Sequence, residues 1–312
     1  MRRLIIVACV LGFAFIAKGQ QLPQYSHFIT NYFMLNPAVA GSAACLDLKI
    51  GYRKQWTGIP GSPSTAFANI HGNLGKKKGK YNFHGLGGMV ETDGAGRFSY
   101  TAAHLAYAYH MRISSKYMLS AGLAAGLYQY RFDFAELAVV DNVGADDALI
   151  GAMAQQFIFP QINLGFWLYK NDRYLGFSIR NLISNQIDGM GEESKTNTHF
   201  ELTAGKIIEL NDDFDFKPAV QFKYVRASKV GLDIQAMIDF KRKFQMGVGF
   251  RSGNGISGLM QIDMFRYVTL AYAYDLTLSK MRFGGTHSHE IILGITACPD
   301  GDSRQIPCAA YN

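Results

Sequence analysis

The chain has 312 residues, of which only 18% are charged while 48% are hydrophobic and 13% are aromatic, and its formal net charge at pH 7 is +7. A soluble secreted domain usually has a charged fraction nearer about 25%, so the composition argues against that class. The basic residues neither cluster on a helix nor alternate with aromatic residues, which argues against a nucleic-acid-binding surface.

The first residues have the pattern of a secretory signal peptide. A basic pair precedes an apolar run at residues 4–16, and Ala17 and Gly19 stand at the two positions that a signal peptidase reads. The run is too short to span a bilayer. We therefore expect residues 1–19 to be removed before Gln20.

Residues 20–44 show no regular alternation but contain several aromatic side chains. Pro37 forces Asn36 out of helical geometry, so a rigid turn is expected before the first strand. The aromatic residues would be poorly placed in a solvated tail, and we expect them to pack inside a barrel, against its periplasmic mouth, or on a partner protein. We expect residues 20–44 to be a periplasmic or plug-like segment, with possible partner contacts at Tyr25, Phe28, Tyr32 and Phe33.

From Leu46 onward the hydrophobic pattern has a period of two. Every second residue from Leu232 to Ile238 and from Val268 to Tyr274 is apolar or aromatic, opposite small or polar residues. This alternation is typical of transmembrane strands. About 14 strands are expected, an even number as bacterial barrels require, at residues 45–54, 64–74, 81–91, 97–110, 117–132, 159–170, 173–183, 198–208, 214–225, 229–239, 243–252, 255–264, 267–277 and 287–296.

The connections support an all-β, antiparallel outer-membrane barrel over residues 45–296. Every second connection between the expected strands is short and mostly basic. The long connections all belong to the other set, at 55–63, 133–158, 184–197 and 278–286. Outer-membrane barrels place short turns in the periplasm and long loops outside. A soluble β-sandwich or lipocalin-like barrel also alternates, but the strand number and the low charge argue against it. Aromatic residues near strand ends are expected to form interfacial girdles, at Tyr52, Trp56, Tyr81, Tyr100, Tyr107, Tyr109, Trp167, Tyr169, Tyr174 and Tyr267.

The motifs that could support chemistry are weak. His287 and His289 share one face of a strand, but no third metal ligand is evident beside them and Glu290. Glycines near residues 85–88 lie inside a strand, whereas a phosphate loop turns from a strand into a helix. We expect no enzyme, with no catalytic residue, cofactor or metal. The sharpest charge run is a solvated turn or a periplasmic contact with a partner, formed by Lys76, Lys77, Lys78 and Lys80.

Three cysteines remain after the signal peptide, so at most one intramolecular disulfide can form. Cys45 begins the first strand and Cys298 follows the last, and these two strands are neighbours in a closed barrel. We expect a bond from Cys45 to Cys298 or Cys308 rather than one within the C-terminal periplasmic tail, residues 297–312, with three free thiols as the remaining alternative.

Motifs at both ends resemble one family. The sequences Pro23-Gln24-Tyr25-Ser26-His27-Phe28 and Asn31 to Gly41 (NYFMLNPAVAG), then Tyr52-Arg53-Lys54-Gln55-Trp56, and finally Ser288-His289-Glu290-Ile291 resemble the PorP/SprF family of type IX secretion system membrane proteins of Bacteroidetes. The resemblance extends from the mature N-terminus to about residue 296.

This resemblance implies a multi-pass barrel in the outer membrane that serves protein secretion and, in gliding members, the export or attachment of adhesins. The implied partners are type IX secretion components, a secreted or cell-surface cargo protein and the lipid bilayer, without nucleic acid. Two other functions compete with it: a passive porin or hydrophobic-solute channel, and an outer-membrane hydrolase, for which the sequence offers no nucleophile and base.

Overall fold

The computed structural model describes residues 22–43, 45–74, 82–133, 154–186, 195–226, 228–265, 267–278 and 287–297. Within these residues the chain is almost entirely antiparallel sheet, with three short 3-10 helices near its start. No helix in the described part has the length and hydropathy to cross a membrane.

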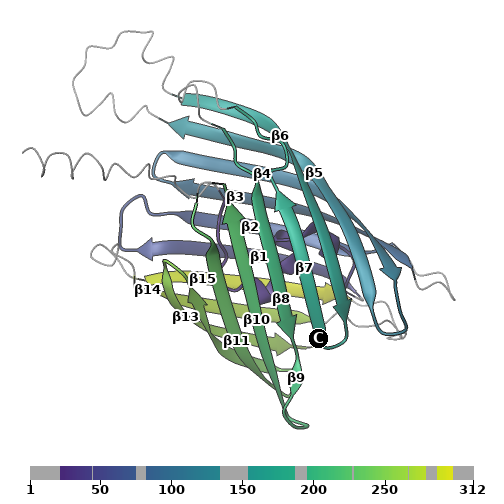
Figure 1. The fold of residues 1–312 in the computed structure, drawn as a ribbon. Coiled ribbons are helices and arrows are strands. Elements are labelled where there is room, and N and C mark those ends of the chain that lie inside the picture. Colours follow the sequence, from purple (N-terminus) through teal and green to yellow (C-terminus); the bar gives the residue numbers. More distant parts are fainter. Residues whose placement is uncertain are drawn as a thin grey trace, which may run out of the picture.

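The strands form a closed 14-strand barrel (Figure 1). Each strand pairs with its neighbours in sequence, and the first and last strands pair to close the ring, with Ile50 opposite Leu293. The predicted fold class is confirmed. The strands are β1 (Leu46–Thr57), β2 (Ser64–Asn73), β3 (Phe83–Ala95), β4 (Phe98–Arg112), β5 (Met118–Asp133), β6 (Ala154–Lys170), β7 (Arg173–Arg180), β8 (His199–Lys206), β9 (Ile208–Glu209), β10 (Phe214–Val225), β11 (Gly231–Phe240), β12 (Phe244–Arg251), β13 (Gly255–Met264), β14 (Val268–Thr277) and β15 (His287–Ala297).

One strand expected over residues 198–208 is interrupted. Its two parts, β8 and β9, pair with β10 in the same register, at Gly205 opposite Ala219 and at Ile208 opposite Phe216. Pro218 lies on β10 between these pairs and has no N–H to donate. The missing donor accounts for the gap in the ladder.

The two faces of the sheet have opposite chemistry. On β1 the outward side chains are apolar or aromatic, such as Ile50 and Tyr52, which are about half exposed, whereas the inward Lys49 and Arg53 are buried. On β4 the outward Leu105 is 77% exposed and the inward Ala106 is 2% exposed. An apolar exterior around a polar interior is the arrangement that a lipid bilayer requires.

Several aromatic residues expected in the interfacial girdles point inward instead. Tyr100, Trp167, Tyr169 and Tyr174 are at most 7% exposed, whereas Tyr52, Tyr107 and Tyr267 are exposed on the outer surface. An aromatic residue near a strand end can face either way, and only clear alternation of apolar and polar neighbours shows which. Small residues occur on both faces of these strands, so the alternation does not show it here.

The barrel has two different ends. The end that we call the short-turn end holds Leu46, Ala297 and the connections 113–117, 171–172 and 241–243. The opposite end, which we call the long-loop end, holds the connections that follow β1, β5, β7 and β14.

A charge placed on the outer face should test the membrane-facing surface. We expect Leu105→Arg to lower the free energy of unfolding by about 2–4 kcal/mol, because Leu105 lies near the middle of β4 and faces outward. Phe265→Arg, at an 82% exposed site in a turn, should cost only about 0–1 kcal/mol. Unfolding from liposomes in urea measures both, and equal effects would contradict the lipid-facing assignment.

We expect the long-loop end to face the cell exterior. Lys229 and Ser115 are both exposed, the first at the long-loop end and the second at the short-turn end. In intact cells, Lys229→Cys should react with a membrane-impermeant maleimide and Ser115→Cys should not. The reverse labelling pattern would show that the barrel has the opposite orientation.

Candidate functional site in the barrel lumen

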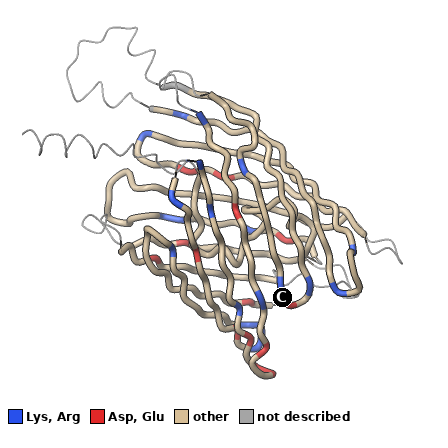
Figure 2. The backbone as a smooth tube through the Cα atoms, in the orientation of Figure 1, with Lys and Arg blue, Asp and Glu red and all other residues tan. Residues whose placement is uncertain are grey.

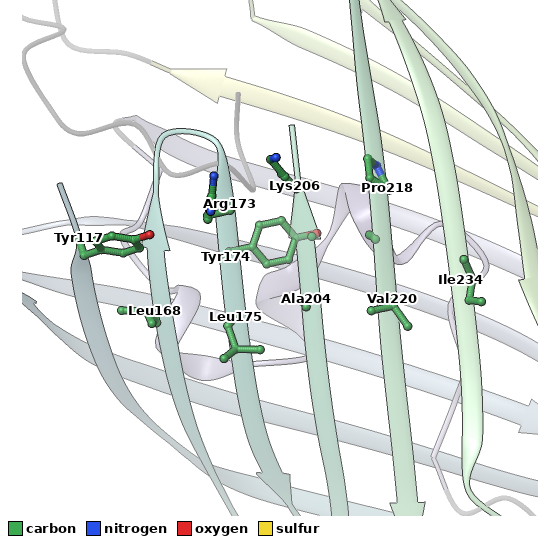
Figure 3. Close-up of a pocket in the computed structure, with 12 residues that line it drawn as sticks. Tyr117, Leu168, Arg173, Tyr174, Leu175, Ala204, Lys206, Pro218, Val220 and Ile234 are labelled. Atoms are coloured by element: carbon green, nitrogen blue, oxygen red, sulfur yellow. The ribbon is translucent and has the colours of Figure 1, made fainter. Parts of the chain in front are cut away.

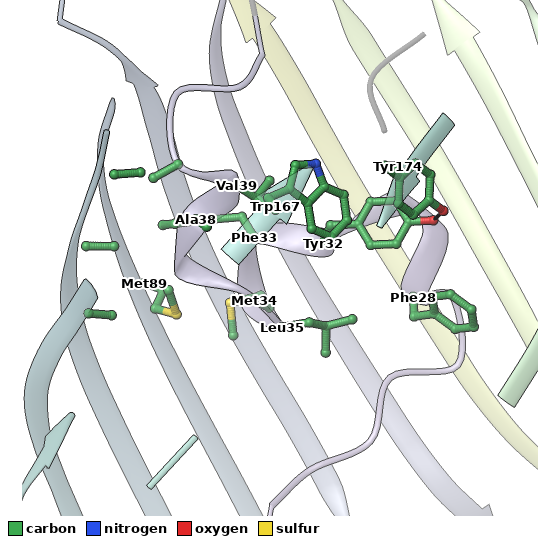
Figure 4. Close-up of a cluster of buried hydrophobic side chains, with 14 of the residues drawn as sticks. Phe28, Tyr32, Phe33, Met34, Leu35, Ala38, Val39, Met89, Trp167 and Tyr174 are labelled. Carbon is green, nitrogen blue, oxygen red and sulfur yellow. Dashed lines mark hydrogen bonds between the residues drawn. The ribbon is translucent and has the colours of Figure 1, made fainter. Parts of the chain in front are cut away.

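The barrel interior is filled by residues 22–43, which we call the plug. It contains the short 3-10 helices η1 (Phe28–Thr30), η2 (Tyr32–Met34) and η3 (Pro37–Val39). Their side chains pack on inward-facing residues of the wall: the Tyr32 ring packs against the stacked rings of Trp167 and Tyr174, with ring centroids 5.4 and 4.9 Å away (Figure 4). The sequence left three locations open for the N-terminal aromatic residues: inside the barrel, at its periplasmic mouth, or on a partner. In the structure they lie inside the barrel.

The second half of the plug is seated on glycines of the wall. Asn36 accepts a hydrogen bond from the Ala38 N–H at 2.9 Å, and its side-chain amide donates to the Phe166 and Phe177 carbonyl oxygens at 3.1 and 3.2 Å. A Cβ added at Gly165 would lie 2.0 Å from Asn36 Oδ1. The wall must therefore be free of side chains here for the plug to approach.

Two other wall glycines also allow the plug main chain to approach the wall closely. A Cβ at Gly122 would lie 2.4 Å from the Ala38 nitrogen, and one at Gly85 would lie 1.9 Å from the Ala40 oxygen. Beside them, His110 Nε2 donates to the Ala40 oxygen at 2.8 Å. We call these three inward glycines of β3, β5 and β6, Gly85, Gly122 and Gly165, the glycine trough.

The first half of the plug is held by charged groups. The N–H groups of Ser26 and His27 both donate to the Glu290 carboxylate, at 2.6 and 2.9 Å. The Ser26 hydroxyl donates to Asp275 and accepts from Arg53 Nε at 2.9 Å. Arg53 also pairs with Asp275 at 3.0 Å. We call this arrangement of Ser26, His27, Arg53, Asp275 and Glu290 the latch.

Neighbouring groups complete the latch. The carbonyl oxygens of Tyr25 and Ser26 accept hydrogen bonds from Arg251 and Gln235. Burial lowers the pKa of His27 to about 4, so its ring is neutral at pH 7. In the latch, the wall side chains thus hydrogen-bond mostly to main-chain N–H and carbonyl groups of residues 25–27.

The latch brings together the motifs at the two ends of the sequence. Ser26 and His27 belong to the first motif, Arg53 to the Tyr-Arg-x-Gln-Trp motif, and Glu290 to the Ser-His-Glu-Ile motif. The Trp56 N–H also donates to the Ser288 hydroxyl at 3.1 Å, across the seam between β1 and β15. The motif residues on the first and last strands thus act on one site.

The plug divides the lumen into two hollows. The long-loop vestibule, about 690 Å³, is lined by plug residues 22–25, Phe28 and Leu35 and by wall residues of β7, β8 and β10 to β12. The short-turn vestibule, about 390 Å³, is lined on the plug side by Ile29, Thr30 and Tyr32. The plug therefore separates the two ends of the barrel over residues 28–32.

Buried residues of both charges occur on the wall, and along the backbone neither Lys and Arg nor Asp and Glu are confined to one end of the barrel (Figure 2). Lys223 pairs with Asp233 at 2.7 Å in the long-loop vestibule. Lys217 pairs with Asp239 at the same distance in the short-turn vestibule. The lining of the long-loop vestibule nevertheless has an excess of cations, which favours anionic solutes: six Lys and Arg side chains line it against Glu201 and Asp233.

A third hollow, of about 570 Å³, lies on the wall across β6 to β11 (Figure 3). Its lining is mostly apolar, and Leu175 and Ile234 there are exposed on the outer face. Ala204 and Pro218 are small residues in its lining, and the polar side chains there are Tyr117, Arg173, Tyr174 and Lys206. The hollow belongs to the lipid-facing surface.

The structure places the residues singled out in the sequence as follows. Tyr25, Phe28, Tyr32 and Phe33 are at most 3% exposed in the lumen, so a partner could reach them only if the plug moved. The four lysines, Lys76, Lys77, Lys78 and Lys80, lie outside the described residues.

The histidine pair does not form a metal site with its neighbour. His287 and His289 point outward, where they hydrogen-bond to Tyr274 and Tyr272, whereas Glu290 points inward to the latch. Among the described residues no group of three or more metal-ligating side chains is found.

Cys45 is disulfide-bonded. The other cysteines, Cys9, Cys298 and Cys308, all lie outside the described residues, so the pairing stays a prediction. We expect peptide mapping without reductant to recover Cys45 joined to Cys298 or Cys308, because Leu46 pairs with Ala297 beside the seam. A peptide that joins Cys298 to Cys308 would contradict it.

Sequence reasoning missed most of the site. Arg53 and Glu290 were noticed only within the family motifs, and Asp275 and the glycine trough were not assigned a role. The sequence does contain a usable signal. Charged residues at inward positions of strands need a partner of opposite charge inside the barrel. Glycines at inward positions of otherwise regular strands indicate that another part of the chain approaches the wall closely.

Comparison with known proteins agrees with this architecture. The family model for the type IX secretion system membrane protein PorP/SprF matches residues 17–295. No curated protein matches the chain significantly. Among solved structures, the P. putida toluene transporter TodX is similar with a TM-score of 0.51 and 7% identity, over 90% of this chain and 95% of that one. The CymD monoaromatic hydrocarbon channel has a TM-score of 0.49 and 11% identity, over 89% and 94%.

Proposed function

Because the chain belongs to the PorP/SprF family of type IX secretion system membrane proteins, we propose that it is a non-enzymatic outer-membrane component of that system. In this role it assists the export or surface attachment of secreted proteins, adhesins of gliding cells among them. Family membership is the observation that carries this proposal. Its partners would be periplasmic and outer-membrane secretion components and a cargo protein.

The filled lumen supports an accessory role. A channel for a protein chain needs a continuous bore, and here residues 22–43 occupy the interior between the two vestibules. A barrel whose lumen is occupied by its own N-terminal segment is better suited to docking an exported protein beside a separate translocon.

A gene deletion tests the proposal. We expect the deletion strain to keep an intact outer membrane while particular secreted or surface proteins are lost from the cell surface and the medium. Purification of the tagged protein in mild detergent, followed by mass spectrometry, should recover type IX secretion components.

The competing function is a solute channel. A deletion strain that secretes normally but loses the uptake of a small solute would overturn the secretion role in favour of that channel. Complementation with the intact gene is the control in both cases.

A further inference from the structure

We propose that the plug is a gate: release of the latch opens a path through the lumen for ions and small polar solutes. The two vestibules already extend from opposite ends toward residues 28–32 of the plug. The plug residues that line the two vestibules all fall within residues 22–35, so this half of the plug, which includes the latch residues Ser26 and His27, is the part that has to move for them to join. The activity is distinct from the proposed secretion role and does not depend on it.

The two halves of the plug are held in different ways, which permits one to move without the other. Residues 36–41 are seated in the glycine trough by close packing, which any displacement destroys. Residues 25–27 are held through hydrogen bonds to charged wall groups. Water can replace such bonds when the segment leaves, so the first half is the part that can be released reversibly.

The wall beside the gate favours a wide path once the segment moves. Ala219 on β10 and Ala271 on β14 are small, inward residues that the plug covers in the closed structure. The ion pairs Lys223–Asp233 and Lys217–Asp239 both join β10 to β11, one pair in each vestibule. Together with the excess of Lys and Arg around the long-loop vestibule, they predict passage of small ions, anions above all, rather than of apolar solutes.

Glu290 is the group to change, because it accepts the N–H groups of both Ser26 and His27. Glu290→Gln keeps the size of the side chain but removes its charge and one acceptor oxygen. Loss of charge-assisted hydrogen bonds should raise the open fraction about tenfold or more. Glu201→Gln is the matched control: Glu201 is also buried and inward, but it pairs with Arg180 and Gln221 of the wall.

The measurement is single-channel conductance of the purified full-length protein in planar bilayers in KCl. We expect the wild-type protein and Glu201→Gln to be closed for most of the time and Glu290→Gln to open frequently. Equal conductance of the folded wild-type and Glu290→Gln proteins would overturn the gate. If Glu290→Gln does not fold, Ser26→Pro removes one of the same hydrogen bonds from the plug side, and the same outcomes apply.

A crosslink shows whether the plug is the moving part. Thr30 Oγ1 lies 3.1 Å from Gln261 Oε1 on β13. Because Cys is shorter than Gln, the thiols of Thr30→Cys and Gln261→Cys are joined with a short bis-methanethiosulfonate reagent rather than by direct oxidation. In the Glu290→Gln background, this reagent should close the pore and reductant should reopen it, whereas Glu290→Gln without the cysteine pair should not respond. Conductance that persists after mass spectrometry has shown the crosslink would overturn the proposal.

Discussion

Alanine at two wall glycines is expected to drive the second half of the plug from its seat. In Gly85→Ala with Gly122→Ala, each new Cβ would overlap a main-chain atom of the plug, at 1.9 and 2.4 Å. Overpacking of this kind costs about 1–3 kcal/mol per site. Cys at Val39, a residue with 0% exposure, reports the displacement. Its thiol should react with a small maleimide roughly 30-fold faster or more than in the wild-type background.

The control uses a glycine of the same strand. Gly88 faces outward, and a Cβ there would have its nearest neighbour at 3.6 Å, so Gly88→Ala should leave the Val39→Cys labelling rate unchanged. All variants should keep the heat-modifiable migration of a closed barrel on gels. Slow labelling in the double variant would show that the plug does not need the glycine trough.

Removal of the buried cation of the latch should have the largest effect on stability. Arg53 is 2% exposed and pairs with Asp275 and Glu290, so Arg53→Met removes from two buried carboxylates the cation that contacts both, and leaves Arg251 as the nearby cation. Breaking a buried ion pair in this way costs about 3–5 kcal/mol. Unfolding of the refolded protein in urea should show this loss.

Two further variants show whether the loss of stability in Arg53→Met comes from the missing buried charge. Arg53→Lys keeps the positive charge but lacks the forked geometry, and should recover part of the stability. Arg173→Met changes an arginine at the start of β7 whose side chain is 47% exposed, and should alter stability by no more than about 0.5 kcal/mol. If Arg53→Met is as stable as Arg173→Met, the latch does not stabilise the barrel.

The strands could be predicted because membrane and lumen impose a period of two on the sequence. Each expected range overlaps a strand of the structure, and among the described residues the ladder departs from regular pairing at Pro218 and at the register shift between Lys54 and Thr57. The even strand number followed from the need to close the ring with both ends on one side.

The site could not be predicted in the same way, because its contacts have no periodicity. Ser26 and Glu290 are 264 positions apart in sequence, and nothing in the spacing relates them before the ring is closed. A glycine in a strand can mark a bulge, a bend or a close backbone approach. Only the position of the plug shows that Gly85 and Gly122 serve the close approach. The family motifs marked Ser26, Arg53 and Glu290 but not the contacts among them.

The position of the latch also constrains how the molecule assembles. Arg53 lies on the first strand, Glu290 on the last, and Ser26 precedes both in the chain. Pairing of β1 with β15 therefore brings together the same groups that capture the N-terminal segment. We therefore expect sealing of the barrel and enclosure of that segment to be coupled, so that removal of the segment also weakens the pairing of the first and last strands.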